Sequence, residues 1–360
     1  MPPHILFDIS AHGLGHIAQS APVVDAVVAL RPDVRITVRS GIPMEALRRR
    51  ISSPFEHLET ADDFGLSMSS SFIVDRDATR CRYRELHDRL DRTLDELAET
   101  MRLASVDLVV SNIGYLALGA ATRAGIENVA FSSINWHDVV RHYCGSGDEM
   151  ASILRDMARI YHGAGQFLRL EPGTAMREFD TTPVPELVVA QGRKRRAELC
   201  DRLLVDPRAL IVAFSFTEAE TQPPPRLEAG SPPGLVSIGP SHWATGAPWH
   251  PLTATGMDFL DLVSTSDLII AKPGYGIVTE AATAGVPTLL VPRDDWPETG
   301  TTSQWYRRHG RFETTRVALD ELTTSDLLLA HSRLIAKDAG PRPATNGAER
   351  IARAVVARLR

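Results

Sequence analysis

The stretch HILFDISAHGLGHIAQSAPVVDAVVAL, residues 4–30, contains the pattern that the rest of the chain repeats. Residues 4–9 form a short, mostly apolar run of strand length, and residues 17–30 place apolar side chains at helical spacing. A loop with two glycines and two histidines joins them. A strand, a glycine loop and a helix in this order predict a βα unit of a parallel sheet.

The same alternation extends along the chain. Further strands are expected at residues 34–39, 106–111, 129–132, 209–216, 235–238, 267–271 and 288–291. Further helices are expected at residues 43–50, 83–103, 116–124, 257–264, 276–284, 303–309 and 347–360. A proline-rich loop spans residues 222–233.

Two such series predict an α/β fold of two doubly wound, Rossmann-like domains. We expect a first domain over residues 1–185, a second over residues 186–345, and a C-terminal helix over residues 346–360 that can cross back to the first. A chain of 360 residues is long enough for two cores, since one domain usually takes about 100–200 residues. Domains of this kind bind ligands at the carboxyl ends of their strands.

The composition argues against several classes of partner. Hydrophobic residues make up 43% of the chain, and apolar runs no longer than a strand predict no membrane span. A formal net charge of −6 argues against nucleic acid. The first residues lack a secretory signal pattern, so we expect a cytoplasmic protein. Three widely spaced cysteines, Cys81, Cys144 and Cys200, indicate neither disulfides nor zinc.

The loop after the first strand is the first candidate site. Gly13 and Gly15 let the backbone come close to a ligand, and the amides at the helix start can bind an oxygen or a phosphate. Ala18 stands where a GxGxxG fingerprint needs its third glycine, so NAD is not expected. His16 is the candidate general base, its pKa lowered by the helix N-terminus, and His12 is a second candidate contact. The competing interpretation is a tightly packed turn with structural histidines.

A second glycine turn, KPGYGIVTEAA at residues 272–282, lies between two predicted strands. The amides of residues 274–277 are placed to bind a diphosphate, with Lys272 beside them. Glu280, one turn into the helix, can accept hydrogen bonds from both hydroxyls of a ribose, or it can simply complement the helix dipole. The predicted donor-binding residues of this turn are Lys272, Gly274, Tyr275, Gly276, Ile277, Thr279 and Glu280.

An acidic loop follows the next predicted strand. Asp294 and Asp295 can bind sugar hydroxyls of the donor, or they can be solvated turn residues. One acidic pair without a third ligand is a weak metal signal, and a helix N-terminus can balance a diphosphate. We therefore expect no metal ion and no cofactor beyond a nucleotide-sugar co-substrate.

These motifs resemble those of the GT-B glycosyltransferases, including the MurG family of N-acetylglucosamine transferases. A closer resemblance, over nearly the whole chain, is to the N-terminal, glycosyltransferase-like region of plant L-arabinokinases and related bacterial proteins. It is carried by GLGH, DLVVSNIGYLALGAATRAGI, SSINWHDVVRHY, LRLEPGTAMREF and AKPGYGIVTEAATAGVPTLLVPRDD. The ATP-dependent GHMP kinase domain of the arabinokinases has no counterpart in these 360 residues, so kinase activity is not expected.

The resemblance implies roles for particular residues. It places Glu280 on the nucleotide ribose, residues 274–276 on the diphosphate and His16 at the catalytic centre. It also makes Asn135 and Trp136 candidate acceptor contacts, although a tryptophan there can equally belong to the core.

One residue departs from the family pattern. GT-B proteins often carry an acid at the end of the strand over residues 106–111, where it can orient the base, and Asn112 occupies that position. A neutral amide cannot stabilise an imidazolium as a carboxylate does. The sequence therefore predicts either an unassisted His16 with Asn112 binding acceptor, or chemistry that needs no strong base.

The sequence thus predicts a glycosyltransferase that moves a sugar from a nucleotide-diphosphate sugar to a hydroxyl or amine of a small-molecule acceptor. UDP follows from the resemblance. The donor contacts would include Gly13 and Gly15 with the second glycine turn, and the acceptor contacts would be His12, Asn112, Asn135 and Trp136. Two alternatives stay open: a nucleotide-sugar hydrolase or epimerase of the same fold, and a nucleotide-sugar-binding regulator without turnover.

Overall fold

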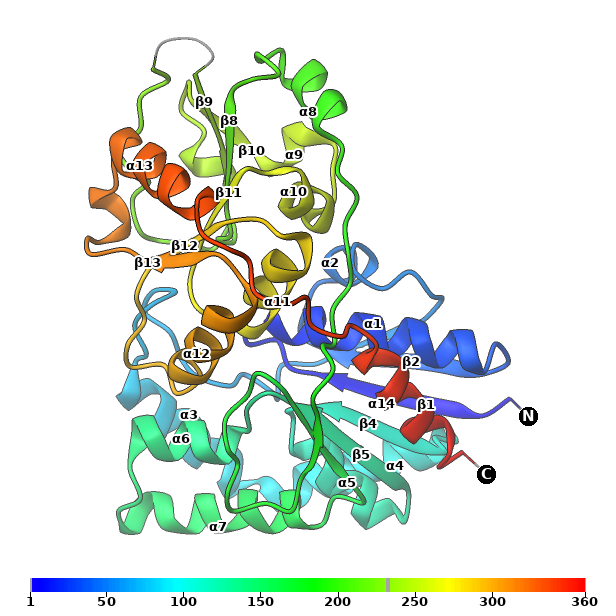
Figure 1. Cartoon of the computed structure of the whole chain (residues 1–360). Helices are drawn as coiled ribbons and strands as arrows, with labels where there is room; N and C mark the ends of the chain where they lie inside the picture. The colour runs from blue at the N-terminus through cyan, green and yellow to red at the C-terminus, as the bar shows by residue number, and fades with distance from the viewer. Residues whose placement is uncertain (1, 231–233, 360) are drawn as a thin grey trace. The chain divides into compact units, whose positions relative to one another are not determined.

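The computed structural model of the chain describes residues 2–230 and 234–359. It divides into two compact units, which Figure 1 shows coloured along the chain. Unit 1 contains the chain up to Ser69, Ile73–Val189 and the chain from Ala344 onward, and unit 2 contains Ser70–Phe72 and Ala190–Pro343. The short segment Ser70–Phe72 therefore groups with unit 2, although it lies within the first 185 residues.

Unit 1 is built on a seven-stranded parallel sheet in the order β3-β2-β1-β4-β5-β6-β7. Its strands are β1 (His4–Ile9), β2 (Arg35–Ser40), β3 (Glu56–Glu59), β4 (Leu108–Asn112), β5 (Glu127–Ser132), β6 (Phe167–Leu170) and β7 (Thr182–Val184). Its helices are α1 (Gly15–Leu30), α2 (Met44–Arg48), α3 (Arg76–Asp88), α4 (Leu90–Leu103), α5 (Leu116–Ala124), α6 (Trp136–Cys144), α7 (Asp148–His162) and α14 (Gly347–Val356). The predicted parallel α/β architecture is confirmed.

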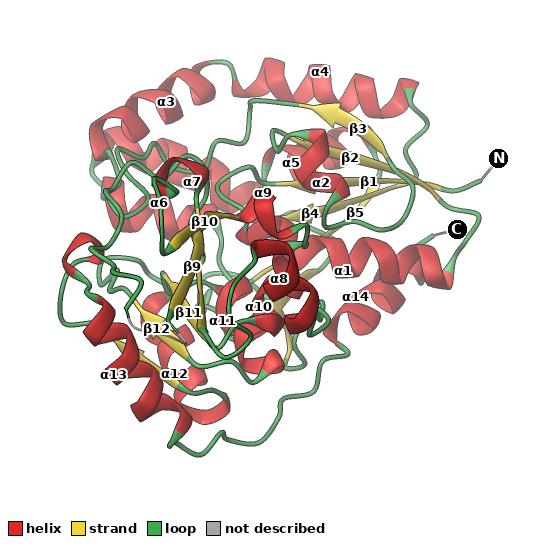
Figure 2. Cartoon of the chain, turned by 90° about the horizontal axis from the view of Figure 1, so that it is seen from above, coloured by secondary structure: helices red, strands yellow, loops and turns green. Residues whose placement is uncertain are grey.

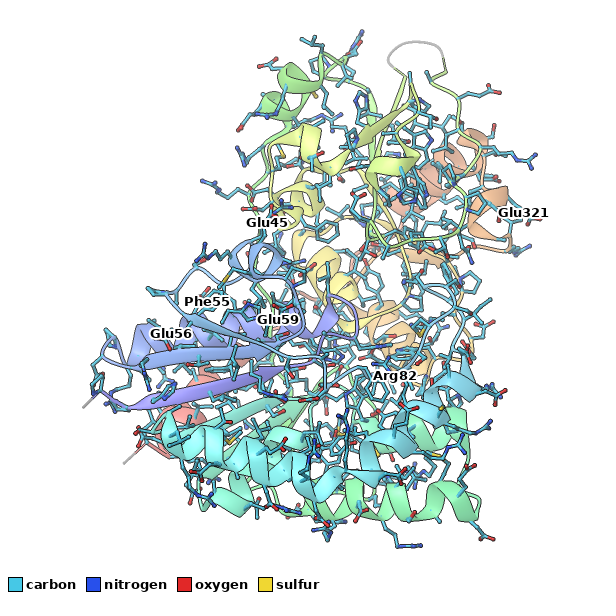
Figure 3. The ribbon with its side chains drawn as sticks, turned by 180° about the vertical axis from the view of Figure 1, so that it is seen from behind. Glu45, Phe55, Glu56, Glu59, Arg82 and Glu321 are labelled. Carbon is cyan, nitrogen blue, oxygen red and sulfur yellow. The ribbon has the colours of Figure 1, made fainter. Side chains whose placement is uncertain are left out.

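Several parts of unit 1 differ from the sequence prediction, which also did not list β6, β7, α6 and α7. The single helix expected over residues 83–103 is two helices, since Arg89, with φ −117° and ψ 13°, ends α3 before α4 begins. Strand β3 was not predicted because its sequence, EHLE, has no apolar run. It is an edge strand whose Glu56 and Glu59 side chains are exposed (Figure 3), and charges on an edge strand discourage pairing with another chain.

Unit 2 has a six-stranded parallel sheet in the order β10-β9-β8-β11-β12-β13. Its strands are β8 (Leu210–Phe214), β9 (Leu235–Gly239), β10 (Trp249–Pro251), β11 (Leu268–Ala271), β12 (Thr288–Leu290) and β13 (Phe312–Thr314). Its helices are α8 (Arg196–Leu203), α9 (Leu252–Thr255), α10 (Phe259–Thr265), α11 (Tyr275–Ala284), α12 (Thr299–His309) and α13 (Thr324–Ile335). Residues 231–233 of the predicted proline-rich loop lie outside the described residues.

Alternate residues of the unit 2 strands build two cores. Ile211 and Ile269 belong to one buried cluster, and their neighbours Val212 and Ile270 belong to another. Because successive side chains of a strand point to opposite faces, the sheet is buried on both sides. Near-continuous apolar strands are the result, and they made β8, β9, β11 and β12 predictable, whereas β10 and β13 were not predicted.

The strand orders define a switch point in each sheet. In unit 1 the chain runs outward from β1 through β2 to β3, then returns to β4 and continues in the other direction. In unit 2 the corresponding reversal lies between β8 and β11. Doubly wound sheets bind ligands at the carboxyl ends of the strands beside such a reversal.

Helix α14 belongs to unit 1 and packs on α1, as Figures 1 and 2 both show. Its N-terminus is tied to the chain after β7, where the Gly347 amide donates to Leu187 O at 3.0 Å. Ile351, Ala352 and Val355 are fully buried. Among the helices of the described chain, none is both long and apolar enough to cross a membrane.

The packing of α14 can be tested with two neighbouring valines. Val355 is 0% exposed, whereas Val356 is only partly buried. Val355→Ala should lower the free energy of unfolding by about 2 kcal/mol, because it removes two buried methyl groups and leaves a cavity. Val356→Ala has the same effect on helix propensity and should cost less than about half as much. Urea denaturation followed by circular dichroism measures both values, and equal losses would contradict the packing described.

Candidate functional site

The loop between β1 and α1 is open on the side of its glycines. Gly13 has a φ of +76°, a left-handed conformation that favours glycine. A Cβ atom built on Gly13 or Gly15 would meet nothing within 4 Å, so the surrounding protein does not crowd this turn. Within the described chain, α1 has no side-chain cap and no acid in its first turn. Its first amides are therefore suited to an oxygen-rich ligand.

His16 is held by a chain of buried side-chain hydrogen bonds. Its Nδ1 lies 2.8 Å from Asn112 Oδ1, Asn112 Nδ2 donates to Gln19 Oε1 at 3.0 Å, and Gln19 Nε2 donates to Ser133 Oγ at 2.9 Å. Because a carbonyl oxygen only accepts, Nδ1 carries the proton and Nε2 carries the lone pair. This tautomer is the one that can accept a proton from a substrate at Nε2.

The imidazole of His16 stays neutral at physiological pH. Burial lowers the pKa of His16 to about 4, and the hydrogen bond to Asn112 opposes this shift only in part. The direction of the pKa shift agrees with the sequence prediction, and its largest cause is removal of His16 from water, which the sequence analysis did not consider. A neutral Asn112 adds no charge to raise the pKa again.

Three of the predicted acceptor contacts are used within unit 1 instead. Asn112 is fully buried and positions His16. Asn135 is fully buried and caps α6, where its Oδ1 accepts from the Asp138 amide at 2.7 Å. Trp136 is 0% exposed, so its ring offers no face for a sugar. We therefore do not carry these three residues forward as acceptor contacts; His12, which is partly exposed, stays a prediction.

The loop after β3 joins this site, which sequence reasoning missed. Trp136 Nε1 donates to Asp63 Oδ1 at 3.1 Å, and the Leu66 amide donates to His12 Nδ1 at 3.3 Å. The Trp136 ring packs edge-on against His12 and His16, with ring centroids 5.2 Å and 5.8 Å apart. The loop is polar and follows an unpredicted strand, so no apolar period pointed to it.

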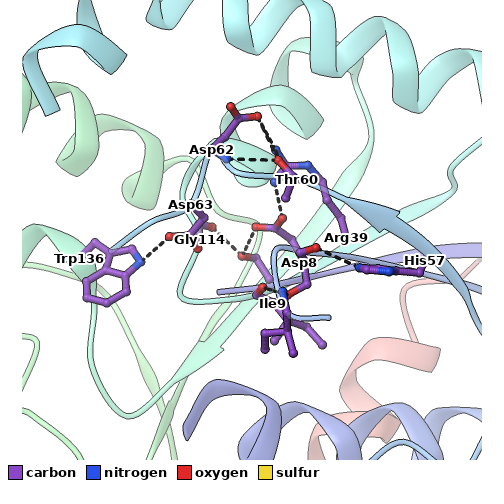
Figure 4. A network of polar contacts seen from close by, with 12 residues as sticks. Asp8, Ile9, Arg39, His57, Thr60, Asp62, Asp63, Gly114 and Trp136 are labelled. Carbon is purple, nitrogen blue, oxygen red and sulfur yellow. Dashed lines mark hydrogen bonds and ion pairs between the residues drawn. The ribbon is translucent and has the colours of Figure 1, made fainter. Parts of the chain in front are cut away.

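A charged cluster lies beneath the same loop (Figure 4). Arg39 Nη1 donates to Asp8 Oδ1 at 2.6 Å, and Arg39 Nη2 donates to Thr60 Oγ1 and Asp62 Oδ2, both at 3.0 Å. The Asp8 and Arg39 side chains are only 2% and 3% exposed. Buried charges persist when they are paired and hydrogen-bonded. An acid inside the apolar strand HILFDI was the available sequence signal.

The second glycine turn lies at the start of α11 in unit 2. Gly274 has no side chain to cap the helix, and within the described residues the first turn of α11 contains no acid. A Cβ built on Gly274 would meet nothing within 4 Å. The turn thus presents its amides as the sequence predicted, and anion binding there stays a prediction.

The other predicted donor contacts differ in how exposed their side chains are. Glu280 is 5% exposed in the second turn of α11, and Asp294 and Asp295 are exposed after β12. Thr279 is fully buried, and its hydroxyl donates back to the carbonyls of Tyr275 and Gly276 at 2.9 Å and 3.0 Å. The Thr279 hydroxyl is therefore part of the helix, and we do not carry it forward as a ligand contact.

The Lys272 ammonium group contacts other residues of unit 2. Its Nζ donates to Ser71 O at 3.2 Å and lies 5.4 Å and 5.8 Å from the ring centroids of Phe72 and Phe216. Burial, assisted by Arg293, lowers the pKa of Lys272 to about 8. An ammonium has three donors, so Lys272 stays a predicted diphosphate contact with one donor already used.

Two further features do not belong to the predicted site. His137, Asp138 and Glu178 offer atoms within 4.8 Å of one another, but Arg141 donates to both carboxylates at 2.8 Å and already balances their charge. A hollow of about 830 Å³ lies beside β13 and α13 in unit 2. Its lining does not include the glycine turn, Glu280 or the acidic loop.

Comparison with solved structures identifies the fold. The chain superposes on the glycotransferase of kitacinnamycin with a TM-score of 0.58 at 15% identity, over 100% of both chains. Together with the two parallel sheets, this shows that the chain has the GT-B fold of two Rossmann-like domains. In this fold it resembles the GT-B glycosyltransferases.

Sequence comparison adds two relatives, while no family model matches the chain. Over 304 residues it is 28% identical to L-arabinokinase of Arabidopsis thaliana, covering 82% of this chain and 29% of that protein. Over 231 residues it is 26% identical to the UDP-N-acetylglucosamine–N-acetylmuramyl-(pentapeptide) pyrophosphoryl-undecaprenol N-acetylglucosamine transferase of Cutibacterium acnes, covering 57% of this chain and 58% of that protein. The chain thus spans less than two thirds of either relative.

The role of Asn112 can be tested by charge. Asn112→Asp should raise the pKa of His16 from about 4 by at least about one unit, because a carboxylate at Nδ1 stabilises the imidazolium. Gln19→Glu puts a carboxylate one hydrogen bond further from the ring and should raise it less. NMR titration of the His16 ring protons measures the shift. An unchanged pKa in Asn112→Asp would show that Asn112 does not hold Nδ1 in solution.

Proposed function

We propose that this protein is a glycosyltransferase that moves a sugar from a nucleotide-diphosphate sugar, a UDP-sugar, to a hydroxyl or amine of a small-molecule acceptor. The observation that carries the proposal is the neutral His16, whose proton is held on Nδ1 and whose Nε2 is ready to act as a base. It lies at the carboxyl end of β1, beside the switch point of unit 1. The name of the bacterial relative supports UDP as the nucleotide.

The donor would be bound chiefly by unit 2. The amides at the start of α11 would donate hydrogen bonds to the diphosphate oxygens, and Glu280 would accept hydrogen bonds from ribose hydroxyls. Asp294 and Asp295 would bind sugar hydroxyls, and Gly13 and Gly15 of the β1–α1 loop stay proposed donor contacts. We propose no metal ion or resident cofactor, because the helix N-terminus supplies positive charge for the leaving diphosphate.

His16 would act as the general base. Its Nε2 would take the proton of the acceptor hydroxyl or amine while the acceptor atom bonds to the anomeric carbon. The bond between that carbon and the diphosphate oxygen breaks, and the nucleoside diphosphate leaves with the electron pair. Because Asn112 carries no charge, the imidazolium gains little stabilisation, and it must pass its proton on quickly.

The first experiment is calorimetric titration with UDP-, GDP-, dTDP- and CDP-sugars, followed by mass spectrometry of any mixture that binds. Binding of one nucleotide class with slow release of free nucleotide would support a transferase that lacks its acceptor. Rapid stoichiometric release of free sugar would instead identify water as the acceptor and a hydrolase as the function. If no nucleotide sugar binds, the proposal is wrong.

Glu280 provides a test of the donor site. Glu280→Gln should weaken nucleotide binding by about 1–3 kcal/mol, because hydrogen bonds to a charged acceptor are lost. The control is Glu228→Gln, which changes an exposed acid elsewhere in unit 2 and should leave affinity unchanged. Calorimetry measures both dissociation constants. Wild-type affinity in Glu280→Gln would remove the ribose assignment.

His16 provides a test of the chemistry. His16→Gln should lower kcat by about 10²–10⁴-fold, the usual contribution of a general base, with nucleotide affinity retained. His162→Gln alters an exposed histidine of the same unit and should be neutral. Steady-state assays with the identified donor and acceptor measure kcat and KM separately. A His16→Gln enzyme with wild-type kcat would end the general-base proposal.

A further inference from the structure

Asp63 presents a buried oxygen that its surroundings do not satisfy. Its Oδ1 accepts the Trp136 indole proton at 3.1 Å, whereas its Oδ2 is buried and has no hydrogen-bond partner in the described part of the chain. Leaving a buried carboxylate oxygen unpaired is costly, and such a group tends to bind a proton instead. We therefore expect the folded protein to favour the protonated form of Asp63.

Asp8 faces the same point from the other side. A Cβ built on Gly114 would lie 2.3 Å from Asp8 Oδ2 and 3.0 Å from Asp63 Oδ2. Both oxygens thus border the small space that exists because residue 114 has no side chain, and Figure 4 shows the two carboxyl groups beside Gly114. Two carboxylates sharing so small a space cannot both ionise without a large cost.

Asp8 Oδ2 also lacks a strong donor. Its partner oxygen, Oδ1, is taken by Arg39. The Ser111 hydroxyl lies 2.6 Å from Gly114 O and 3.3 Å from Asp8 Oδ2, and its single proton goes to the nearer acceptor. One proton on this pair of carboxyl groups would remove one of the two neighbouring charges.

The charges around the pair agree with one bound proton. Among the described residues, Arg39 is the cation hydrogen-bonded to this cluster, and it interacts with the three carboxyl groups of Asp8, Asp62 and Asp63. Burial and the charge of Asp8 raise the pKa of Asp63 to about 7, against the opposing effects of Ser10, Arg39 and Trp136. Other titratable groups of the surroundings include the phenols of Tyr83, Tyr115 and Tyr161 and the rings of His12, His16 and His57.

We propose that Asp63 and Asp8 share one proton across Gly114, and that Asp63 is a positioning residue for His16 that acts through Trp136. The path is short and tightly packed. A Cβ on Gly65 would lie 2.6 Å from the Trp136 ring and 2.7 Å from His12 Cβ, so the loop over residues 60–66 cannot shift without moving that ring. The proposal of a carboxyl pair does not depend on the proposed transfer reaction. Any effect of the pair on a reaction rate would rest on that proposed function.

The sign of the pH effect follows from the raised pKa. The folded state favours protonated Asp63, so this contribution to stability is complete below the ordinary carboxyl pKa of 3.8 and is lost as the pH rises through about 7. Above that pH two neighbouring carboxylates repel each other, and the loop loosens from the Trp136 ring. Unit 1 should accordingly be more stable at pH 6 than at pH 8.

NMR of the five tryptophan indole N–H groups tests the pair directly in the whole protein. The indole signal of Trp136, assigned as the one missing in Trp136→Phe, should shift with a midpoint near pH 7. The step should be absent in Asp63→Asn, move to lower pH in Asp8→Asn, and persist in the control Asp62→Asn. A flat Trp136 signal from pH 5 to 9, or a step that survives in Asp63→Asn, would overturn the proposal.

The positioning role has its own readout. The His16 ring protons, assigned with His16→Gln, should show a second step near pH 7, although the pKa of His16 itself lies near 4. A merely structural Asp63 would leave those signals flat, and that result would overturn the positioning role. The wild-type titrations need no Asp63 variant, so a variant that fails to fold leaves both tests intact. They also need no substrate, so failure of the proposed transferase function would be seen separately.

Discussion

The hydrogen bond between His16 Nδ1 and Asn112 Oδ1 is the interaction on which the site in unit 1 depends. It joins the first turn of α1 to the last residue of β4, the strand that pairs with β1 on the far side of the switch point. It is buried, so it is not exchanged for water, and it selects the tautomer of the imidazole. Burial also lowers the pKa of His16, so the ring is neutral and can accept a proton at neutral pH.

The register of β1 and β4 places an uncharged hydrogen-bond network and a charged network on opposite faces of the sheet. Asp8 pairs with Ser111, and Ile9 pairs with Asn112. Because successive side chains of a strand point to opposite faces, Ser111 turns toward Asp8 while Asn112 turns toward α1 and His16. Two separate polar networks thus lie at the carboxyl ends of β1 and β4. Trp136 touches both, since its indole bonds Asp63 and its ring packs on His16.

The βα units were predictable because their signals are local. Apolar runs marked β1 and β11, and glycines marked the turns that open α1 and α11. What sequence reasoning missed was set by partners far apart in the chain: His16 and Asn112 are 96 residues apart, and Trp136 and Asp63 are 73 apart. The spacing of apolar residues along the sequence does not predict such a pairing. The burial of Asn135 as a helix cap was not predicted, and for Trp136 the sequence left the core and an acceptor contact equally open.

In the described part of both units, the helix that begins at a glycine turn lacks a side-chain cap, whereas some other helices are capped, and this bears on what the turns can bind. In unit 1 the Asp75 side chain accepts the Ala78 amide at the start of α3, and in unit 2 Thr323 does the same for α13, yet α11 begins at a glycine. An uncapped helix start recruits acceptor oxygens, whereas the carboxylate of Glu280, further along the same helix, recruits donors. A ligand that matches both would carry an anionic group beside a pair of hydroxyls, as the diphosphate and the ribose of the proposed nucleotide sugar do.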